Sequence, residues 1–512
     1  MKYDSPSLFA NSAKASNQAL LIGFVAFVSY AYFYSGGGWN QNTRFDLVRA
    51  MVERGTLSID AYHQNTGDKV FKDGHYYSDK APGQPLLAVP AAVGTRAAIR
   101  ASGADPLSAR SLVALAYTCT LFSAALPMAL ACACLYWIAL RIGASANAAA
   151  FGALAMGLGT PMWAYATLLW AHALAGACLL FAFAAVLKLD PQKAGGEVLW
   201  GFIAGLMSGW ATVTEYPAAP ASAIIALFAI ARVWPSGWPR RLRVAGGVAG
   251  GALLCVLVLV LYLRATFGSA LHTGYSYYDP NAFPWMNRGF HGLRYPRIDV
   301  VFKLLFGLKR GLFVAAPVLV AAPIGVWLIW KGHATRAAGL TAAAVFTYYL
   351  LFNASFGEWS AGWSYGPRYM AAGIPLLCVG LAPAWDHFHR NGRRVMLALL
   401  MVSLLFSLIA VSTTPQPPFE YRSPMPQLLW PSFWSGLLAL ERTSMLTTSD
   451  LDAGGAHGAF NLGQLMGLHG LASLLPLLAV WVLAGAVWAR TRERDKEHLL
   501  VSAETRQRAG TK

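Results

Sequence analysis

Charged side chains are scarce in this sequence. They make up 12% of its 512 residues, whereas 56% are hydrophobic. Soluble domains carry roughly 25% charged residues, so an ordinary soluble protein is excluded and the chain has to bury apolar surface in lipid. The apolar–polar alternation of a membrane β-barrel is also absent, and backbone amides in lipid must then be satisfied within helices. We therefore predict an all-α integral membrane protein.

Cysteine is sparse as well, and its positions do not suggest a metal site or a disulfide. All six cysteines lie inside segments that are apolar enough to span a membrane. Cys132 and Cys134 are two residues apart, so their side chains diverge by about 200° around a helix. We interpret the six as small apolar side chains.

Nucleic-acid binding is excluded despite a formal net charge of +17. The sequence has no zinc-ligand spacing, no RNP-like strand and no basic recognition helix. Its lysines and arginines gather in short loops and in the C-terminal tail, where they set the orientation of a membrane protein.

Apolar runs long enough to cross a hydrocarbon core of about 30 Å recur along the chain. About twelve are predicted to be transmembrane helices, and they cover residues 18–35, 110–139, 145–159, 162–187, 198–213, 216–231, 244–264, 311–330, 337–353, 370–385, 395–412 and 462–489. The segment 84–100 has a helical pattern but is short and begins among prolines. We place it as a juxtamembrane helix on the outer surface.

Basic clusters predict the topology. Arginines in the loops 232–243 and 390–394 and in the tail after residue 490 favour the cytoplasmic side for these segments. Both termini are then cytoplasmic, and residues 1–489 form one multi-pass membrane domain followed by a disordered basic tail, 490–512. The outer loops are predicted to be 36–109, 265–310, 354–369 and 413–460.

The first outer loop combines the residue types that a sugar-phosphate site requires. Apolar Phe45, Val48 and Val52 recur at helical spacing, which predicts an amphipathic helix on the membrane surface, and Gly55 is a natural C-cap. Residues 75–83 follow as a compact polar section with Tyr77, Asp79 and Lys80. In such a site the cations bind the phosphate, a carboxylate accepts a proton, and aromatic rings stack on the faces of the sugar. The alternative interpretation of these residues is a surface loop held together by ordinary ion pairs.

Residues 356–369 form a second candidate binding segment directly before a predicted span. Glu358, Tyr365, Arg368 and Tyr369 occur here among glycines and tryptophans. Arginine suits bidentate phosphate contact, so the segment favours a binding turn over a simple aromatic belt at the membrane interface.

Three further side chains are candidates for contact with a substrate. His172 and Glu215 lie near the outer ends of predicted spans, where ionisable groups are functional candidates. Glu215 could equally mark a tight turn between helices, and His172 a packed histidine. Tyr277, in the tyrosine-rich stretch 274–279 of the predicted outer loop 265–310, could stack on a sugar ring or serve as an interfacial tyrosine.

Three short motifs resemble those of the GT-C superfamily of polyprenyl-phosphate-sugar glycosyltransferases, especially the bacterial aminoarabinose and mannosyl transferases of the family-39 type. Residues 41–45 (Gln-Asn-Thr-Arg-Phe) resemble that family's Asp-Glu-x-Arg-Tyr element, and residues 79–82 (Asp-Lys-Ala-Pro) its Glu-Lys-Pro element. Residues 365–369 (Tyr-Gly-Pro-Arg-Tyr) resemble a Lys-Leu-Pro-x-Tyr stretch before a later span. The resemblance covers most of the chain in architecture but only about 60 residues in motif.

The resemblance implies a transferase in a bacterial-type plasma (inner) membrane, with its active site on the periplasmic or extracellular side. Its partners would be a polyprenyl-phosphate-linked sugar donor, the membrane lipid, and a glycan, lipid or protein acceptor. Lys80 and Arg368 would hold the donor phosphate while Arg44 positions the loop. The family's acidic pair is replaced by Gln41 and Asn42, which leaves the catalytic base open.

Asp46 is our replacement for the missing base, followed by Asp79 and Glu358. A divalent cation is compatible with these acids, but no ligand spacing requires one. The alternatives are a lipid or sugar-lipid transporter or flippase without transferase activity, an oligosaccharide ligase or polymerase, and an inactive member of the family. A transporter would need polar groups deep in its spans or helices broken at the midplane.

Overall fold

The computed structural model describes residues 12–190, 192, 194–279, 281, 283–440 and 458–491, with side chains from residue 15 onward. It is an all-α membrane protein in which two short two-stranded ribbons accompany the helices. Most of the tail predicted to be disordered, and residues 441–457 of the last predicted outer loop, lie outside the described residues.

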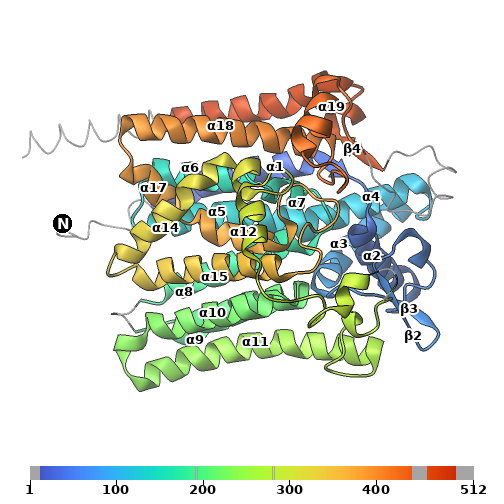
Figure 1. The fold of residues 1–512 in the computed structure, drawn as a ribbon, viewed down its shortest axis with the longest axis horizontal. Coiled ribbons are helices and arrows are strands. Elements are labelled where there is room, and N and C mark those ends of the chain that lie inside the picture. The colour runs from blue at the N-terminus through green and yellow to red at the C-terminus, as the bar shows by residue number, and fades with distance from the viewer. Residues whose placement is uncertain are drawn as a thin grey trace, which may run out of the picture.

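Long helices lie side by side along the long axis of the molecule (Figure 1). They are α1 (Ser12–Ala31), α4 (Ala109–Thr120) continued into α5 (Leu126–Arg141), α6 (Ala146–Leu158), α8 (Ala171–Lys188), α9 (Glu197–Thr214), α10 (Ala218–Arg232), α11 (Trp238–Phe267), α14 (Ala322–Lys331), α15 (Arg336–Ser355) and α18 (Arg390–Thr413). A last apolar helix covers Gly470–Thr491. Each segment predicted as a span is helical over most of its length.

The predicted number of spans is not confirmed. Among the described residues, 6 helices are long and apolar enough to cross a membrane, or up to 7 if one pair bent by 46° counts as a single span. Several predicted spans are shorter or broken. The segment 162–187, for example, is divided into the 5-residue helix α7 (Met162–Ala166) and α8.

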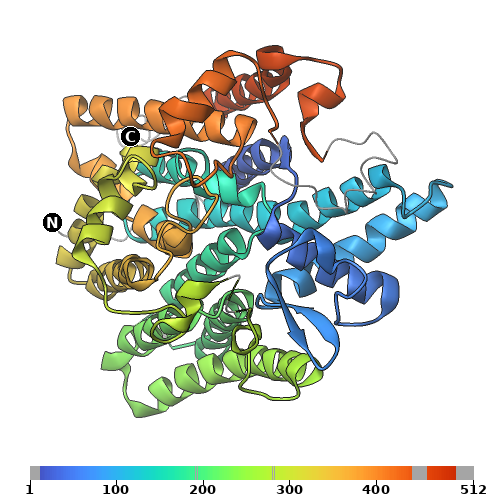
Figure 2. The same cartoon turned by 45° about the vertical axis from the view of Figure 1, so that its right-hand side comes forward.

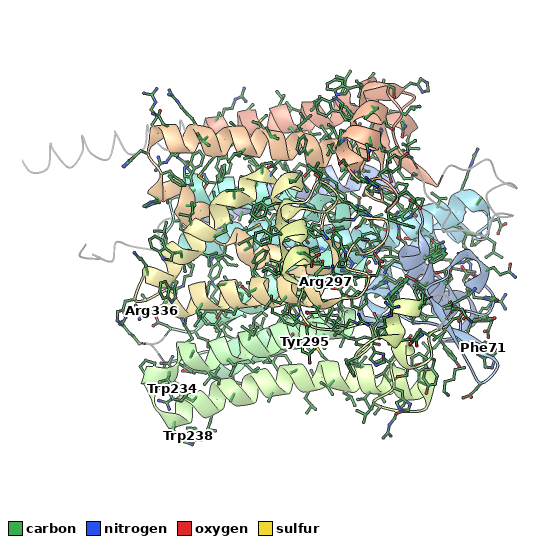
Figure 3. All side chains as sticks on the ribbon, viewed as in Figure 1. Phe71, Trp234, Trp238, Tyr295, Arg297 and Arg336 are labelled. Atoms are coloured by element: carbon green, nitrogen blue, oxygen red, sulfur yellow. The ribbon has the colours of Figure 1, made fainter. Side chains whose placement is uncertain are left out.

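Loops rich in arginine converge at one end of the bundle. Arg141 donates to the carbonyl of Leu187, Arg232 to those of Leu189 and Ala334, and Arg240 to Asp190. Figure 3 shows Trp234, Trp238 and Arg336 together at this end and Phe71 at the opposite one. The clustering matches the predicted cytoplasmic grouping, although the side of the membrane stays a prediction.

The first loop builds a compact unit at the other end (Figure 2). It consists of α2 (Trp39–Arg49), a hairpin of β2 (Lys69–Lys72) and β3 (His75–Ser78), and α3 (Gly83–Ala101), the helix predicted over 84–100. The hairpin turns through Asp73 and Gly74, both with positive φ, as a two-residue Asp-Gly turn requires. Two short strands, β1 (Phe33–Ser35) and β4 (Ala459–Asn461), pair nearby.

The predicted helix is confirmed, but both its polar and its apolar side are buried within the protein; its position relative to the membrane surface stays a prediction. α2 continues as a π-helical segment, Ala50–Arg54, and ends at Gly55 in the left-handed conformation. Phe45 and Val48 are buried in a cluster with residues of α3 and α4. The apolar face of α2 therefore packs against protein, which anchors the loop rigidly to the bundle.

Glycines allow α9 and α11 to pack in close contact. A Cβ added to Gly205 would overlap the backbone of Val248, and one added to Gly251 would overlap the backbone of Phe202. Small residues at such positions let membrane helices approach closely. The six cysteines are all free, and all but Cys134 are buried.

Candidate active site

A cavity of about 690 Å³ opens at the end that carries the first-loop unit. Its walls come from all four predicted outer loops, represented by Arg44, Tyr275, Arg368 and Gln416, and from the N-terminal end of α8. A volume of this size lies within the range of small-molecule sites. The loops that are polar in sequence therefore meet around one space.

Two arginines line this cavity, and neither forms an ion pair with a carboxylate in the described part of the chain. Arg44 is only 3% exposed, and its guanidinium donates to the side chain and carbonyl of Asn40 at 2.8 and 3.2 Å. Arg368 contacts the hydroxyl of Tyr369 at 3.4 Å and lies over the ring of Trp170 at 4.9 Å. The Nε atoms of both arginines are buried without a hydrogen-bond partner among the described residues.

Burial lowers the pKa of Arg44, while Glu215 and Asp79 act in the opposite direction. Guanidinium groups stay charged in proteins, and a buried charge is costly unless it is paired. Two such groups facing one cavity are suited to hold an anion.

Lys80, in contrast, is already paired. Its ammonium lies 2.7 Å from Asp79 and 3.0 Å from Asp68. Although burial opposes the effect, these carboxylates raise the pKa of Lys80 above its ordinary value. Burial raises the pKa of Asp79 to about 6 even though Lys80 lowers it. The positive charge of Lys80 is thus neutralised by its ion pairs with Asp68 and Asp79.

His172 and Glu215 form a second buried pair. The Nδ1 atom of His172 contacts the carboxylate of Glu215, and both residues line the cavity. Glu215 occupies the tight turn between α9 and α10, where its backbone amide donates to Ala211. From the sequence, Glu215 could either form a tight turn or contact a substrate. In the structure it lies in the turn and also lines the cavity.

Trp170 is fixed at the centre of the site. Its indole donates to the Gln41 side chain at 2.7 Å, and the amide of Gln84 donates to its carbonyl at 3.1 Å. The ring lies 5.7 Å from that of His172. Further aromatic side chains line the cavity and offer flat apolar faces: Trp39, Tyr275, Tyr278, Phe283, Trp285, Phe356 and Tyr369.

Arg310 holds the loop that carries Glu358 and Arg368. It is 1% exposed and donates to the carbonyls of Ser360 at 2.9 Å and of Gly362. The loop is therefore anchored from beneath by a buried cation that does not line the cavity. Glu358 does line it and accepts a hydrogen bond from Ser360.

The structure brings most of the predicted site residues together. Those that line the cavity are Arg44, Asp79, Lys80, His172, Glu215, Glu358, Arg368 and Tyr369. Four others are absent from its walls: Asp46, Tyr77, Tyr277 and Tyr365.

Asp46 lies on the side of α2 away from the cavity. It is fully buried and accepts a hydrogen bond from Asn65 at 3.2 Å. Burial raises its pKa well above the ordinary value. A carboxyl that cannot reach the cavity is not a base for a substrate bound there, so we do not retain Asp46 in that role.

The three tyrosines outside the cavity have packing roles. Tyr77 and Tyr277 both pack on the ring of Phe267, with ring centroids 5.7 and 5.4 Å from it. Tyr365 donates to the carbonyl of Ala315 at 2.9 Å. The neighbours of Tyr277, Tyr275 and Tyr278, face the cavity instead.

Sequence reasoning missed Asp68 and Gln41 as lining residues, and within the tyrosine-rich stretch 274–279 it chose Tyr277 instead of Tyr275 and Tyr278. The tyrosines had a usable signal, since they belong to the same Tyr-rich stretch as Tyr277. Asp68 had none, because only the folded hairpin brings it to Lys80. The described residues contain no group of three or more His, Cys, Asp or Glu side chains that could hold a metal ion.

No protein-family model and no curated protein matches this sequence. The structure is similar to crystal structures of ArnT from Cupriavidus metallidurans, bound to undecaprenyl phosphate (TM-score 0.48, 18% identity, 79% of this chain and 65% of that chain) and in the apo state (0.47, 18%, 78% and 65%). It is also similar to the archaeal oligosaccharyltransferase AglB from Archaeoglobus fulgidus in complex with an inhibitory peptide and a dolichol-phosphate (0.46, 12%, 80% and 57%).

The matched region spans less than two thirds of each of those chains. At these identities and scores the similarity describes the fold only. We therefore build the function of the cavity from its own residues.

Proposed function

We propose that this protein is a membrane glycosyltransferase that moves a sugar from a polyprenyl-phosphate donor to an acceptor hydroxyl inside the cavity. The observation that carries the proposal is the pair of arginines, Arg44 and Arg368, which line the cavity and whose Nε atoms have no hydrogen-bond partner among the described residues. A phosphate satisfies both, because guanidinium groups match phosphate oxygens in geometry and charge.

The remaining walls fit the other parts of such a donor. Aromatic faces, including Tyr275 and Trp285, suit a sugar ring, and phenylalanines such as Phe290 and Phe419 provide an apolar lining for the first units of a lipid chain. The long helices hold the rest of the molecule in the membrane, so a lipid-linked donor reaches the cavity without leaving the bilayer.

In the reaction, the acceptor oxygen attacks the anomeric carbon while the bond from that carbon to the phosphate oxygen breaks. The departing polyprenyl phosphate gains a negative charge as the bond breaks. Arg44 and Arg368 stabilise this charge where it develops, which lowers the barrier. The acceptor proton passes to a basic group of the cavity.

A transporter function is less well supported by this structure than a transferase function. Its best support is the bent pair formed by Arg368–Cys378 and Leu381–His387. At the bend, however, Gly380 packs against Gly325 so closely that a Cβ on either would overlap the other helix. The residues around the bend are apolar and buried, so close packing accounts for it without a polar transport site.

The test uses the full chain in lipid nanodiscs, a panel of polyprenyl-phosphate sugars and an assay for released polyprenyl phosphate. We expect release that depends on an added acceptor. Arg44→Gln and Arg368→Gln should each weaken donor affinity by about 10- to 100-fold, since a hydrogen bond to a charged group contributes about 1.5–3 kcal/mol.

Arg394→Gln is the matched control, because Arg394 is exposed and lies outside the cavity, at the start of α18. Unchanged donor affinity in both cavity variants would contradict the phosphate site. Donor binding without any release across the panel would favour a transporter or an inactive protein.

A further inference from the structure

We propose that His172 and Glu215 act together as the general base of this site, with His172 as the catalytic residue and Glu215 as its positioning residue. The assignment rests on the transferase function proposed above. It supplies the proton acceptor that the neutral Gln41 and Asn42 cannot provide.

The contacts of His172 fix which nitrogen is free. Its Nδ1 contacts the Glu215 carboxylate, and an ionised carboxylate only accepts hydrogen bonds. Nδ1 therefore carries the hydrogen, and the lone pair of Nε2 is left as an acceptor. Nε2 is buried and has no hydrogen-bond partner among the described residues, while His172 lines the cavity.

The Glu215 carboxylate contacts Nδ1 of His172 and forms no ion pair with any other described residue, although Arg44 is close enough to be influenced by its charge. A carboxylate on Nδ1 fixes the orientation of the imidazole and stabilises the imidazolium that forms when Nε2 takes a proton.

The base and the phosphate site face the same indole ring. The guanidinium of Arg368 lies 4.9 Å from the Trp170 ring, and the His172 ring lies 5.7 Å from it. A sugar whose phosphate contacts Arg368 would thus lie beside the indole ring that His172 also contacts. The proposal places the attacking oxygen within reach of His172 on this basis.

The three other acids on the cavity wall are less suited to the role. Asp68 and Asp79 are bound to Lys80 at 3.0 and 2.7 Å, and Glu358 accepts a hydrogen bond from Ser360 in its own loop.

The step is balanced. The hydroxyl proton of the acceptor passes to Nε2 of His172 as the acceptor oxygen bonds to the anomeric carbon. The electron pair of the breaking carbon–oxygen bond stays on the departing polyprenyl phosphate. The imidazolium then returns its proton to solvent or to that phosphate before the next turnover.

The test compares His172→Gln, His172→Ala, Glu215→Gln and Asp79→Asn with the wild type in nanodiscs. One measurement is acceptor-dependent release of polyprenyl phosphate, and the other is binding of undecaprenyl phosphate, followed by tryptophan fluorescence. We expect His172→Gln to lose turnover by about 100-fold or more, the usual share of a general base, with lipid-phosphate binding unchanged.

Two further results separate chemistry from folding. Added imidazole should restore turnover to His172→Ala, because the free base fills the space left by the side chain, and Glu215→Gln should lower kcat with KM for the donor unchanged. His333→Gln, at an exposed histidine between α14 and α15, is the matched control with normal turnover.

The assignment of His172 as the base is overturned if His172→Gln has wild-type turnover, or if only Asp79→Asn loses turnover. Neither result contradicts the proposed transferase function. If the wild type binds undecaprenyl phosphate but releases none from any donor, the proposed function fails and the base fails with it. If His172→Gln does not fold, His172→Asn and the imidazole response of His172→Ala decide the question.

Discussion

Lys80 provides the sharpest test of how charge is arranged in this site. The sequence motif suggested that Lys80 holds a phosphate, but the structure places its ammonium between Asp68 and Asp79, at 3.0 and 2.7 Å. The three side chains are 15%, 12% and 8% exposed. Lys80→Met keeps the length of the side chain and leaves both carboxylates without their cation.

The expected loss of stability follows from this burial. Removing one partner of a buried ion pair costs about 3–5 kcal/mol. The pKa of Asp79 gives an independent scale: its rise from 3.8 to about 6 through burial corresponds to about 3 kcal/mol at 1.36 kcal/mol per pKa unit. This is the cost of ionising Asp79 in the folded protein with Lys80 still in place, and without Lys80 that cost becomes larger.

The sign of the pH dependence is also determined. The pKa of Asp79 is higher in the folded protein than in the unfolded chain. Its contribution to stability is therefore fully present below about pH 4 and is lost as the pH rises through about 6. Lys80→Met removes the cation that favours the ionised form, so its deficit should be largest near pH 8 and smaller near pH 5. Adding Asp79→Asn should recover most of the deficit at pH 8.

The assay is the free energy of unfolding in mixed micelles by SDS titration, at pH 5 and pH 8, together with binding of undecaprenyl phosphate. We expect low stability in Lys80→Met and near-normal binding wherever the protein is folded. The reasoning is refuted if Lys80→Met is as stable as the wild type at pH 8 but has lost affinity for the lipid phosphate. That result would return Lys80 to the phosphate site.

Two further predictions concern residues outside the cavity. Asp46→Asn should leave turnover unchanged in the release assay, because Asp46 is buried away from the cavity and contacts Asn65; a large loss would restore Asp46 as a candidate base. Gly251→Ala should destabilise the protein by about 1–3 kcal/mol in the SDS titration, because its Cβ would overlap the backbone of Phe202. Gly246→Ala on the same helix has open space around the added Cβ and should be neutral or slightly stabilising, so equal effects of the two would contradict the close packing of α9 and α11.

Hydropathy predicted the helices well because a backbone in lipid has little choice of structure. The basic clusters also grouped the loops correctly in space: residues from all four predicted outer loops line one cavity. The number of crossings was harder to predict. Whether a segment such as 162–187 continues or breaks depends on its packing, and the break between α7 and α8 places Trp170 and His172 in the cavity.

One error could have been avoided from helix geometry alone. Residues two apart on an α-helix point about 200° apart, so Arg44 and Asp46 cannot both face one cavity. Gln41 and Arg44, three apart, share a face, and both line the cavity. Helix periodicity alone therefore argues against Asp46 as the base, although it lies only two residues after Arg44 in the sequence.

Other features required the fold. Lys80 and Asp68 are brought together by the β2–β3 hairpin, and His172 and Glu215 belong to different helices and the turns that bound them. Pairing between distant segments decides which cation is free to bind a ligand. Residue type alone therefore identified Arg44, Lys80 and Arg368 as a group but not which of them is unpaired.

The neutral residue at position 41 connects these observations. An acid there would lie three residues before Arg44, within ion-pair reach on the same helix face, and would neutralise it. Gln41 instead accepts a hydrogen bond from Trp170 at 2.7 Å and leaves the Nε atom of Arg44 unpartnered. Gln41 is not a carboxylate and cannot serve as the base, whereas the ring of His172, the base proposed above, lies 5.7 Å from that of Trp170. A neutral residue at position 41 thus agrees with the base that we propose on α8, and Gln41→Glu should weaken donor binding through a new ion pair with Arg44.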